Sequence, residues 1–208
     1  MNQKFLQSNL YKEYANKQKV SYCSFESQYD QWSRGQERFI DMMIANDYSH
    51  DAKILDVSCG DGVGLQYFKS KNFANVVGVD FQEEKVKRAS SYGYPVYQMD
   101  FHNMEFFQDN SFDVIYSSHS LEHALNPYLV LNEFYRIAKL QASLIVVLPY
   151  PDNGPDDAHC SKYILGTTEN DGGIKVIKYI ESFGFKNVHV SFDSYREPEI
   201  WLKFIKVE

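Results

Sequence analysis

From residue 54 onward, short runs of β-branched and other apolar residues alternate with longer amphipathic stretches. This alternation is typical of strands that are joined by crossover helices in a mostly parallel sheet. It predicts seven strands, over residues 53–57, 75–79, 95–99, 112–117, 143–148, 186–192 and 201–207. Helices are expected between them, over residues 64–71, 83–92, 126–138 and 173–183. The predicted fold class is therefore a doubly wound α/β sheet.

Only a turn containing Pro198 separates the last two predicted strands, so we expect them to pair antiparallel. The sheet is then mostly parallel, with one antiparallel strand at its end, near the C-terminus. Residues 1–50 instead carry many aromatic residues and a helical spacing of Phe39, Ile40, Met43 and Ile44. We expect two or three helices there, laid against the carboxyl edge of the sheet as an N-terminal helical cap or lid. Residues 51–208 would form the sheet domain, with one structural domain overall in a chain of 208 residues.

The formal net charge of −7 and the scattered Lys and Arg residues disfavour nucleic acid as a partner, because a phosphate backbone needs a concentrated basic surface. Three cysteines, Cys23, Cys59 and Cys160, lie far apart and form no CxxC pair. This pattern favours reduced thiols and a cytoplasmic location over a disulfide framework or a zinc site. The first residues contain no apolar signal region, and the longest apolar stretch, residues 144–148, is far too short for a membrane span. We therefore expect no membrane insertion.

The first predicted strand runs into a glycine-rich stretch, residues 56–64, with the sequence Asp-Val-Ser-Cys-Gly-Asp-Gly-Val-Gly. Glycines let backbone N–H groups come close to a ligand, and the start of the following helix offers unpaired donors. The second strand leads to Asp80, 18 residues after Gly62, about where a βαβ unit places a ribose-binding carboxylate. Asp100 follows the third strand, where a bound adenine would need an acceptor for its amino group. Each aspartate could instead cap a helix or form a turn.

Four segments, in this order, resemble the motifs of the class I S-adenosylmethionine-dependent methyltransferases: residues 54–62, 77–81, 97–101 and 112–123. In the first segment, Ser58 stands where the family usually has a glycine. The resemblance implies a Rossmann-like fold and S-adenosylmethionine as the cofactor, with Asp80 on the ribose, Asp100 on the adenine and Asp56 fixing the loop. The expected cofactor-binding residues are Arg34, Asp56, Ser58, Cys59, Gly60, Gly62, Asp80, Phe81, Asp100, Phe101 and Ser117.

A nicotinamide or flavin enzyme also combines a strand, glycines and a later acid. Its G-x-G-x-x-G pattern needs a third small residue, but that place falls on Leu65. A pyrophosphate would also lie beside Asp56 and Asp61, an electrostatic cost that a sulfonium does not incur. Both features disfavour a dinucleotide cofactor. Arg34 precedes the glycine run, where it either meets the methionine carboxylate or forms a surface salt bridge.

Methyl transfer to a hydroxyl requires a base that removes its proton, and histidine titrates in the right range. His119 and His123 follow the fourth strand, and His159 lies in a loop after the fifth, so these are the three candidate catalytic residues. His123 could instead pack at a helix start. The loop that holds His159 also holds three aspartates that could bind a divalent ion with it, Asp152, Asp156 and Asp157. We expect a solvated acidic turn there and no metal.

The fourth strand ends in Ser117-Ser118-His119-Ser120, whereas enzymes that methylate exocyclic amines of nucleic acid carry Asn or Asp followed by Pro-Pro and an aromatic residue. We therefore predict a small-molecule acceptor, methylated on a hydroxyl, in the class of a nucleotide sugar or glycan precursor. Two alternatives stay open: N-methylation of a small metabolite, and a non-catalytic accessory module that only binds S-adenosylmethionine. We expect a monomer or a homodimer.

Overall fold

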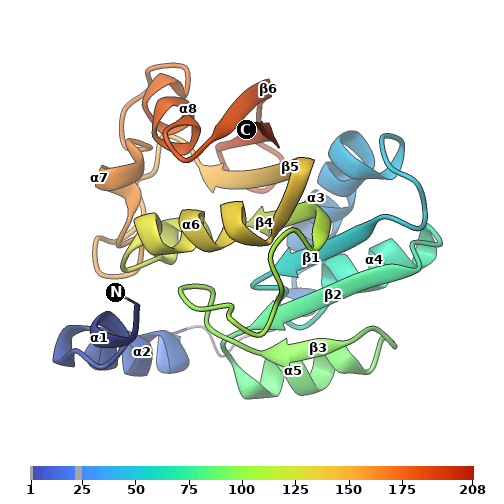
Figure 1. Ribbon diagram of the computed structural model, residues 1–208, viewed down its shortest axis with the longest axis horizontal. Helices are drawn as coiled ribbons and strands as arrows, with labels where there is room; N and C mark the ends of the chain where they lie inside the picture. Colours follow the sequence, from blue (N-terminus) through green and yellow to red (C-terminus); the bar gives the residue numbers. More distant parts are fainter. Residues whose placement is uncertain (1, 22–24) are drawn as a thin grey trace.

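A computed structural model gives the fold and describes residues 2–21 and 25–208. Its centre is a seven-stranded sheet with the strand order β3-β2-β1-β4-β5-β7-β6 (Figure 1). The strands are β1 Lys53–Val57, β2 Asn75–Asp80, β3 Val96–Gln98, β4 Phe112–Ser118, β5 Ala138–Pro149, β6 Phe185–Asp193 and β7 Glu199–Lys206. The helices of the sheet domain are α4 Val63–Ser70, α5 Glu83–Ser90, α6 Pro127–Ile137, α7 Lys162–Leu165 and α8 Ile174–Glu181, with the 3-10 turn η3 Leu121–His123. This architecture confirms the predicted fold class.

The reversed strand is β7, which pairs antiparallel with both β5 and β6, while the other pairings are parallel. The structure differs from the expectation at one point, because β7 lies inside the sheet and β6 forms its edge. The cause is the composition of the two strands. Ile200, Trp201, Leu202 and Phe204 of β7 are buried, whereas alternate residues of β6, such as Val188, are exposed. A strand that is apolar on both faces belongs in the interior of a sheet.

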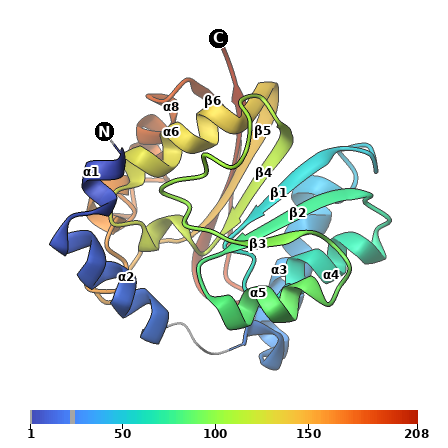
Figure 2. The same ribbon diagram turned by 60° about the horizontal axis from the view of Figure 1, so that its bottom comes forward.

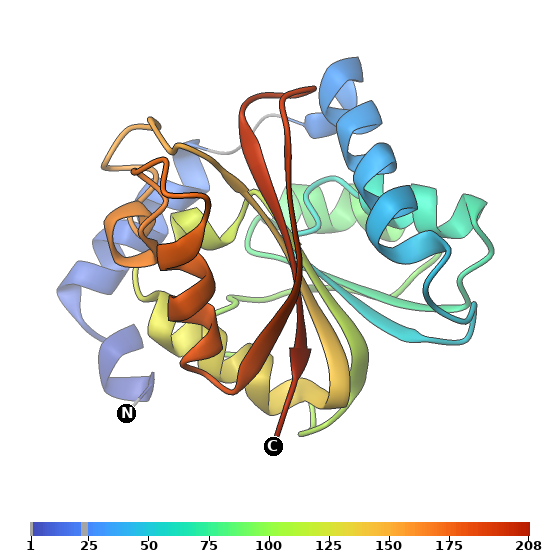
Figure 3. The same cartoon turned by 90° about the horizontal axis from the view of Figure 1, so that it is seen from above.

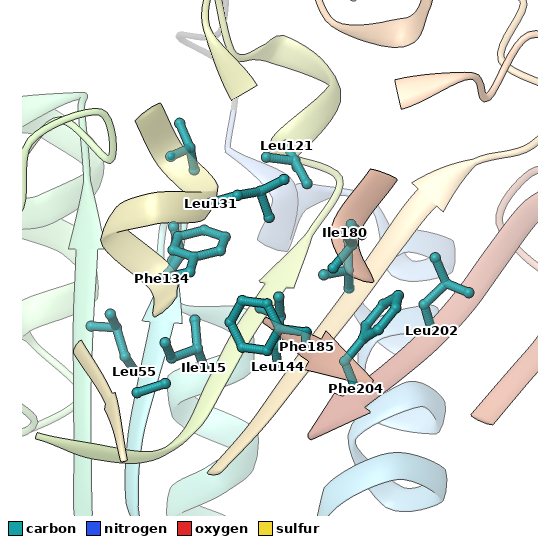
Figure 4. Packing of buried hydrophobic residues seen from close by; sticks show 14 of the residues in the cluster. Leu55, Ile115, Leu121, Leu131, Phe134, Leu144, Ile180, Phe185, Leu202 and Phe204 are labelled. Atoms are coloured by element: carbon teal, nitrogen blue, oxygen red, sulfur yellow. The ribbon is translucent and has the colours of Figure 1, made fainter. Parts of the chain in front are cut away.

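Helices cover both faces of the sheet, and each face has its own apolar core. Figure 3 shows the orange α8 and yellow α6 on one side and the blue α3 (Asp30–Ile40) on the other. On the first side, Phe134 of α6 and Ile180 of α8 pack against Leu144 and Phe204 of the sheet (Figure 4). Helix α6 begins with Pro127 after Asn126, whose side chain accepts a hydrogen bond from the Leu129 backbone, a standard N-cap.

The N-terminal segment divides between two places. Helices α1 (Asn2–Leu6) and α2 (Asn9–Ser21) lie at one end of the sheet, near α6 and α5 (Figure 2). Phe39 and Ile40 of α3, with Met43 and Ile44 of the π-helical turn η2 (Asp41–Ala45), are buried in the second core with α4. That part of the predicted cap is therefore packed on a face of the sheet and not at its carboxyl edge.

Two further findings concern the cysteines and membranes. Cys59 is buried and Cys160 is half-buried, while Cys23 lies outside the described residues. None of the helices in residues 2–21 and 25–208 is both long enough and apolar enough to cross a bilayer.

Candidate functional site

The loop after β1 takes a left-handed backbone conformation at three positions. Ser58 has φ +54°, Gly60 +57° and Gly62 +93°. Serine thus adopts here the conformation that a glycine would take most readily. The Cys59 N–H donates to the carbonyl of Val79 at 2.9 Å, which ties the loop to the end of β2. With serine at position 58, the loop therefore still makes the turn that a glycine would allow.

Asp80, at the end of β2, connects the loop to the next helix. Its Oδ2 accepts a hydrogen bond from the Gly60 N–H at 2.9 Å, and its Oδ1 accepts one from the Gln82 N–H at 2.8 Å. Burial raises the pKa of this carboxyl group, although the two amides and nearby Lys85 favour the ionised form. The carboxyl group is therefore held in one orientation at the edge of the sheet.

A cavity of about 120 Å³ lies directly in front of this loop. Tyr14 and Gln18 of α2 form its outer wall, and the Gln82 side chain donates to the carbonyl of Gln18 at 2.8 Å. Six of the predicted cofactor-binding residues line it: Ser58, Gly60, Asp80, Phe81, Asp100 and Phe101. The cavity combines aromatic surfaces with two carboxyl groups, which suits a nucleoside; we call it the nucleoside cavity.

The two carboxyl oxygens of Asp100 differ in their hydrogen bonds. Its Oδ1 accepts from the His102 N–H at 2.9 Å and lies 2.8 Å from His102 Nδ1. Its Oδ2 is buried and receives no hydrogen bond from the described part of the chain. A buried acceptor without a donor is costly, and an adenine amino group in the nucleoside cavity would supply the missing donor. The residues present therefore fit an adenosine-containing cofactor.

Asp56 is a residue of β1 and does not line the nucleoside cavity. It is 1% exposed, and a Cβ added at Gly64 would lie 2.6 Å from its Oδ2. Burial, and next the charge of Asp80, raises the pKa of Asp56 well above its ordinary value. Asp56 thus packs against the start of α4.

A second, larger cavity of about 530 Å³ adjoins the first. We call it the chamber. The two cavities share four lining residues, Ser58, Gly60, His119 and His123. The chamber walls otherwise include Trp32 and Gln36 from α3 and four polar or charged residues from later segments: Glu122, His159, Arg196 and Glu197. A group bound at the glycine loop would therefore face a polar chamber.

His119 has carboxyl groups at both ring nitrogens. Its Nε2 lies 2.8 Å from Glu199 Oε2, and its Nδ1 lies 3.2 Å from Glu197 Oε1. Burial lowers the pKa of His119, but the bonds to Glu197 and Glu199 outweigh it, so the net shift is upward. Arg196, 3.0 Å from Glu199, packs against Trp32 and completes this buried network.

His123 and His159 contact each other edge to face, with ring centres 4.9 Å apart. His123 Nδ1 lies 3.0 Å from the carbonyl of Ala158, and burial lowers the pKa of this histidine. His159 Nδ1 lies 2.7 Å from Oδ1 of buried Asp152, and this hydrogen bond raises the pKa of His159. The three histidines thus differ in their partners and in the direction of their pKa shifts.

Comparison with known proteins agrees with this geometry. Residues 55–146 match the family described as a methyltransferase domain. A sterol 24-C-methyltransferase of Aspergillus fumigatus is 28% identical over 65% of this chain and 38% of its own length. Phosphoethanolamine N-methyltransferase 3 of Arabidopsis thaliana is 27% identical over 53% of this chain and 23% of its own length. The chain thus spans less than half the length of these relatives.

Residues 55–146 therefore form a methyltransferase domain. The cofactor of this family is S-adenosylmethionine, which the nucleoside cavity fits. A solved methyltransferase of Methanosarcina mazei superposes with a TM-score of 0.63 at 17% identity, covering 79% of this chain and 97% of that one. The [4+2]-cyclase SpnF superposes with a TM-score of 0.67 at 14% identity, covering 85% of this chain and 82% of that one. Because a cyclase shares the fold, the fold alone does not decide the reaction.

Three of the predicted cofactor-binding residues, Arg34, Ser117 and Gly62, line neither cavity. The Arg34 side chain is 62% exposed and pairs with Asp30 at 3.0 Å, so the structure shows the surface salt bridge. Ser117 is buried, and its hydroxyl lies 2.6 Å from that of Ser120. Gly62 caps α4 and lines neither cavity, whereas Cys59 lines the chamber.

The aspartates of the loop after β5 have separate partners. Asp156 pairs with Lys162 at 2.6 Å, Asp157 pairs with Lys17, and Asp152 is bonded to His159. Among the described residues, no group of three His, Cys, Asp or Glu side chains could hold a metal ion. Sequence reasoning missed four residues of the chamber and its support: Glu122, Arg196, Glu197 and Glu199. Glu122 lies within the fourth motif-like segment, residues 112–123, but the other three residues belong to no motif and are brought to the chamber or its support by the fold.

Proposed function

We propose that the protein transfers a methyl group from S-adenosylmethionine to a small polar molecule. The observation that carries the proposal is the junction of the two cavities at Ser58, Gly60, His119 and His123. A nucleoside held beside Asp80 and Asp100 would place the rest of the cofactor at this junction, facing the chamber. When bound, S-adenosylmethionine supplies a methyl group on a positively charged sulfur.

His159 is the best-placed general base among the three histidines. Buried Asp152 accepts from His159 Nδ1, which orients the ring and leaves Nε2 as the proton acceptor. In contrast, His119 has a carboxyl group at each nitrogen, and His123 has a lowered pKa. The cofactor, held beside Asp80 and Asp100, would supply the methyl group to the acceptor oxygen, and His159 would take the proton of that hydroxyl.

The acceptor class that we favour is a sugar hydroxyl, in a nucleotide sugar or glycan precursor. The chamber supports a polar acceptor because it offers hydrogen-bonding side chains on several walls and the ring of Trp32. A small amine is the second candidate, favoured by the carboxyl groups of Glu122 and Glu197 in the same walls. These groups make an apolar acceptor such as a sterol a poor fit.

Helix α2 supports the proposal of a cap over the cofactor. Tyr14 and Gln18 close the nucleoside cavity, and Lys17 pairs with Asp157 in the loop that leads to His159. The cap and the loop would then enclose the cofactor together. We also propose a cytoplasmic location, which the free thiol of Cys160 supports.

The test combines binding and turnover. Calorimetry with S-adenosylmethionine and S-adenosylhomocysteine should show binding, with NADH as the negative control. Release of S-adenosylhomocysteine is then followed over sugars, nucleotide sugars, ethanolamine, histamine and a sterol. Turnover with a sugar supports the favoured acceptor, and turnover with an amine supports the second. Binding without any turnover points to an accessory module, and failure to bind either cofactor form refutes the proposal.

The base is tested by replacing each of the three histidines singly with alanine. His159→Ala should lower turnover by at least about 100-fold, the usual contribution of a general base, with little change in affinity for S-adenosylhomocysteine. His189→Ala is the matched control, because His189 is an exposed residue of β6. Full turnover in His159→Ala would exclude His159, and full turnover in all three variants would exclude a histidine base.

A further inference from the structure

Glu122 is a buried acid in the chamber wall whose carboxyl group is not fully used by the protein. It belongs to the turn η3, directly after β4, and is 1% exposed. Its Oε2 receives no hydrogen bond from the part of the chain that the structure describes. Near its Oε1 are His119 Nδ1 at 3.7 Å and His123 Nε2 at 3.6 Å, both beyond hydrogen-bonding distance.

Other buried glutamates of this chain have donors at both oxygens. Glu199 Oε1 accepts from Trp201 Nε1 at 2.7 Å, and its Oε2 meets His119 and Arg196. Both oxygens of Glu133 meet the Arg136 guanidinium, and its Oε2 also accepts from the Met104 N–H at 2.8 Å. Leaving a buried polar atom without a donor is unfavourable, so such an atom in a cavity wall indicates that a ligand supplies the donor.

The cationic groups around Glu122 have nearer acceptors. His119 lies closer to Glu197 and Glu199 than to Glu122, and the Arg196 guanidinium pairs with Glu199. His119 and Arg196 thus have closest partners other than Glu122. Both cavities include the neighbouring His123, so Glu122 lies beside the junction at which the methyl group would be transferred.

We propose that Glu122 binds the methyl acceptor by accepting a hydrogen bond from its hydroxyl or ammonium group. This inference rests on the proposed function, which it deepens by naming the residue that selects the acceptor. The acceptor must carry a proton donor at or beside the atom that is methylated. A carboxyl group in this place disfavours acceptors that offer only apolar surface.

The first experiment needs no acceptor. Thermal unfolding is measured for the ligand-free wild type, for Glu122→Gln and for the matched control Glu133→Gln. Glu133→Gln should lower Tm, because it removes an ion pair and the charged acceptor of the Met104 N–H. Glu122→Gln should leave Tm unchanged or raise it, because no protein donor loses its partner. A fall in Tm as large as that of Glu133→Gln would show a structural role and overturn the proposal.

The second experiment measures acceptor binding through Trp32, which lines the chamber, while the other tryptophan, Trp201, is buried. The complex with S-adenosylhomocysteine is titrated with two probes, ethanolamine as a cation and glucose as a neutral polyol. At least one probe should change the Trp32 fluorescence, and Glu122→Gln should lower the affinity for that probe by at least about tenfold. Loss of the response in Trp32→Phe checks the origin of the signal.

The outcomes separate this inference from the proposed function. Weaker ethanolamine binding in Glu122→Gln identifies an ammonium ligand, and weaker glucose binding identifies a hydroxyl ligand. Equal probe affinity in the wild type and Glu122→Gln, or no response to either probe, overturns the role of Glu122 while S-adenosylhomocysteine still binds. Calorimetry showing no S-adenosylhomocysteine binding in the wild type would instead remove the proposed function. Glu122→Gln should keep that affinity within about twofold, and a larger loss would contradict a role confined to the acceptor.

Discussion

Asp80→Asn should weaken S-adenosylhomocysteine binding more than any other single-atom change at the edge of the sheet. The two oxygens of Asp80 accept from the Gly60 and Gln82 backbone amides at 2.9 and 2.8 Å. Asparagine keeps one acceptor oxygen and presents an NH2 group at the other position. One backbone N–H therefore loses its acceptor, and the ribose loses a charged one.

The magnitude follows from the energy of hydrogen bonds to charged groups. Each contributes about 1.5–3 kcal/mol, so losing one bond to the ribose should raise the Kd about 10- to 150-fold. The pH dependence provides a second signature. Because burial raises the pKa of Asp80, protonation should weaken binding in the wild type as the pH falls through that raised pKa. The asparagine variant lacks this group and should lose that part of the pH dependence.

Isothermal titration calorimetry of S-adenosylhomocysteine measures both effects. Asp113→Asn is the matched control, because Asp113 accepts from Lys53 N and Lys139 Nζ at the opposite end of β4. That variant should bind the ligand as the wild type does. If Asp80→Asn binds within about threefold of the wild type while its Tm is intact, Asp80 does not hold the ribose and the reasoning from this edge of the sheet is wrong.

Three further outcomes are expected. Gly62→Ala should destabilise the fold by about 2 kcal/mol or more in denaturant titrations, because φ is +93° and the new Cβ would lie 2.9 Å from Cα of Ala89; an unchanged midpoint would contradict this. Because the folded-state pKa of Asp56 is raised, the wild type should lose stability as the pH rises from about 4 through that pKa. Asp56→Asn should remove this loss. Unfolding of both proteins is measured at pH 5 and pH 8, and an equal pH dependence of the two would refute the prediction. The hydrogen bond to Asp152 raises the pKa of His159. In Asp152→Asn this pKa should fall, so the acid limb of the pH–rate profile should move to lower pH. If the acid limb stays at the same pH, His159 paired with Asp152 is not the general base.

Local sequence predicted the parallel half of the sheet well, because each of its strands is an apolar run bounded by turn residues. Strand β1 has the predicted bounds, 53–57, and β2 extends one residue further, to Asp80. Strand β5 begins at Ala138, five residues earlier than predicted, because α6 leads into it without a turn. The inner position of β7 follows from a comparison of two strands, because β7 is apolar on both faces whereas β6 exposes alternate residues.

The candidate site divides in the same way. The glycine loop, Asp80 and Asp100 follow strand ends in sequence order, so a local pattern could predict that they meet at one edge. The Arg34 guanidinium has the right chemistry to bind a carboxylate of the cofactor, but the side chain is exposed and pairs with Asp30. Chemistry alone did not show which of several plausible side chains would face a cavity.

The sequence by itself determined the alternation of strands and helices, the glycine-rich loop and the order of the acids at the strand ends, because these depend on periodicity and on residues close together in the chain. Only the tertiary structure decided the chamber. Glu199 meets His119 across 80 residues, and His159 contacts His123, which lies in the turn η3 after another strand. Burial and pairing between distant segments set which carboxyl oxygens have donors, and no local pattern carries that information.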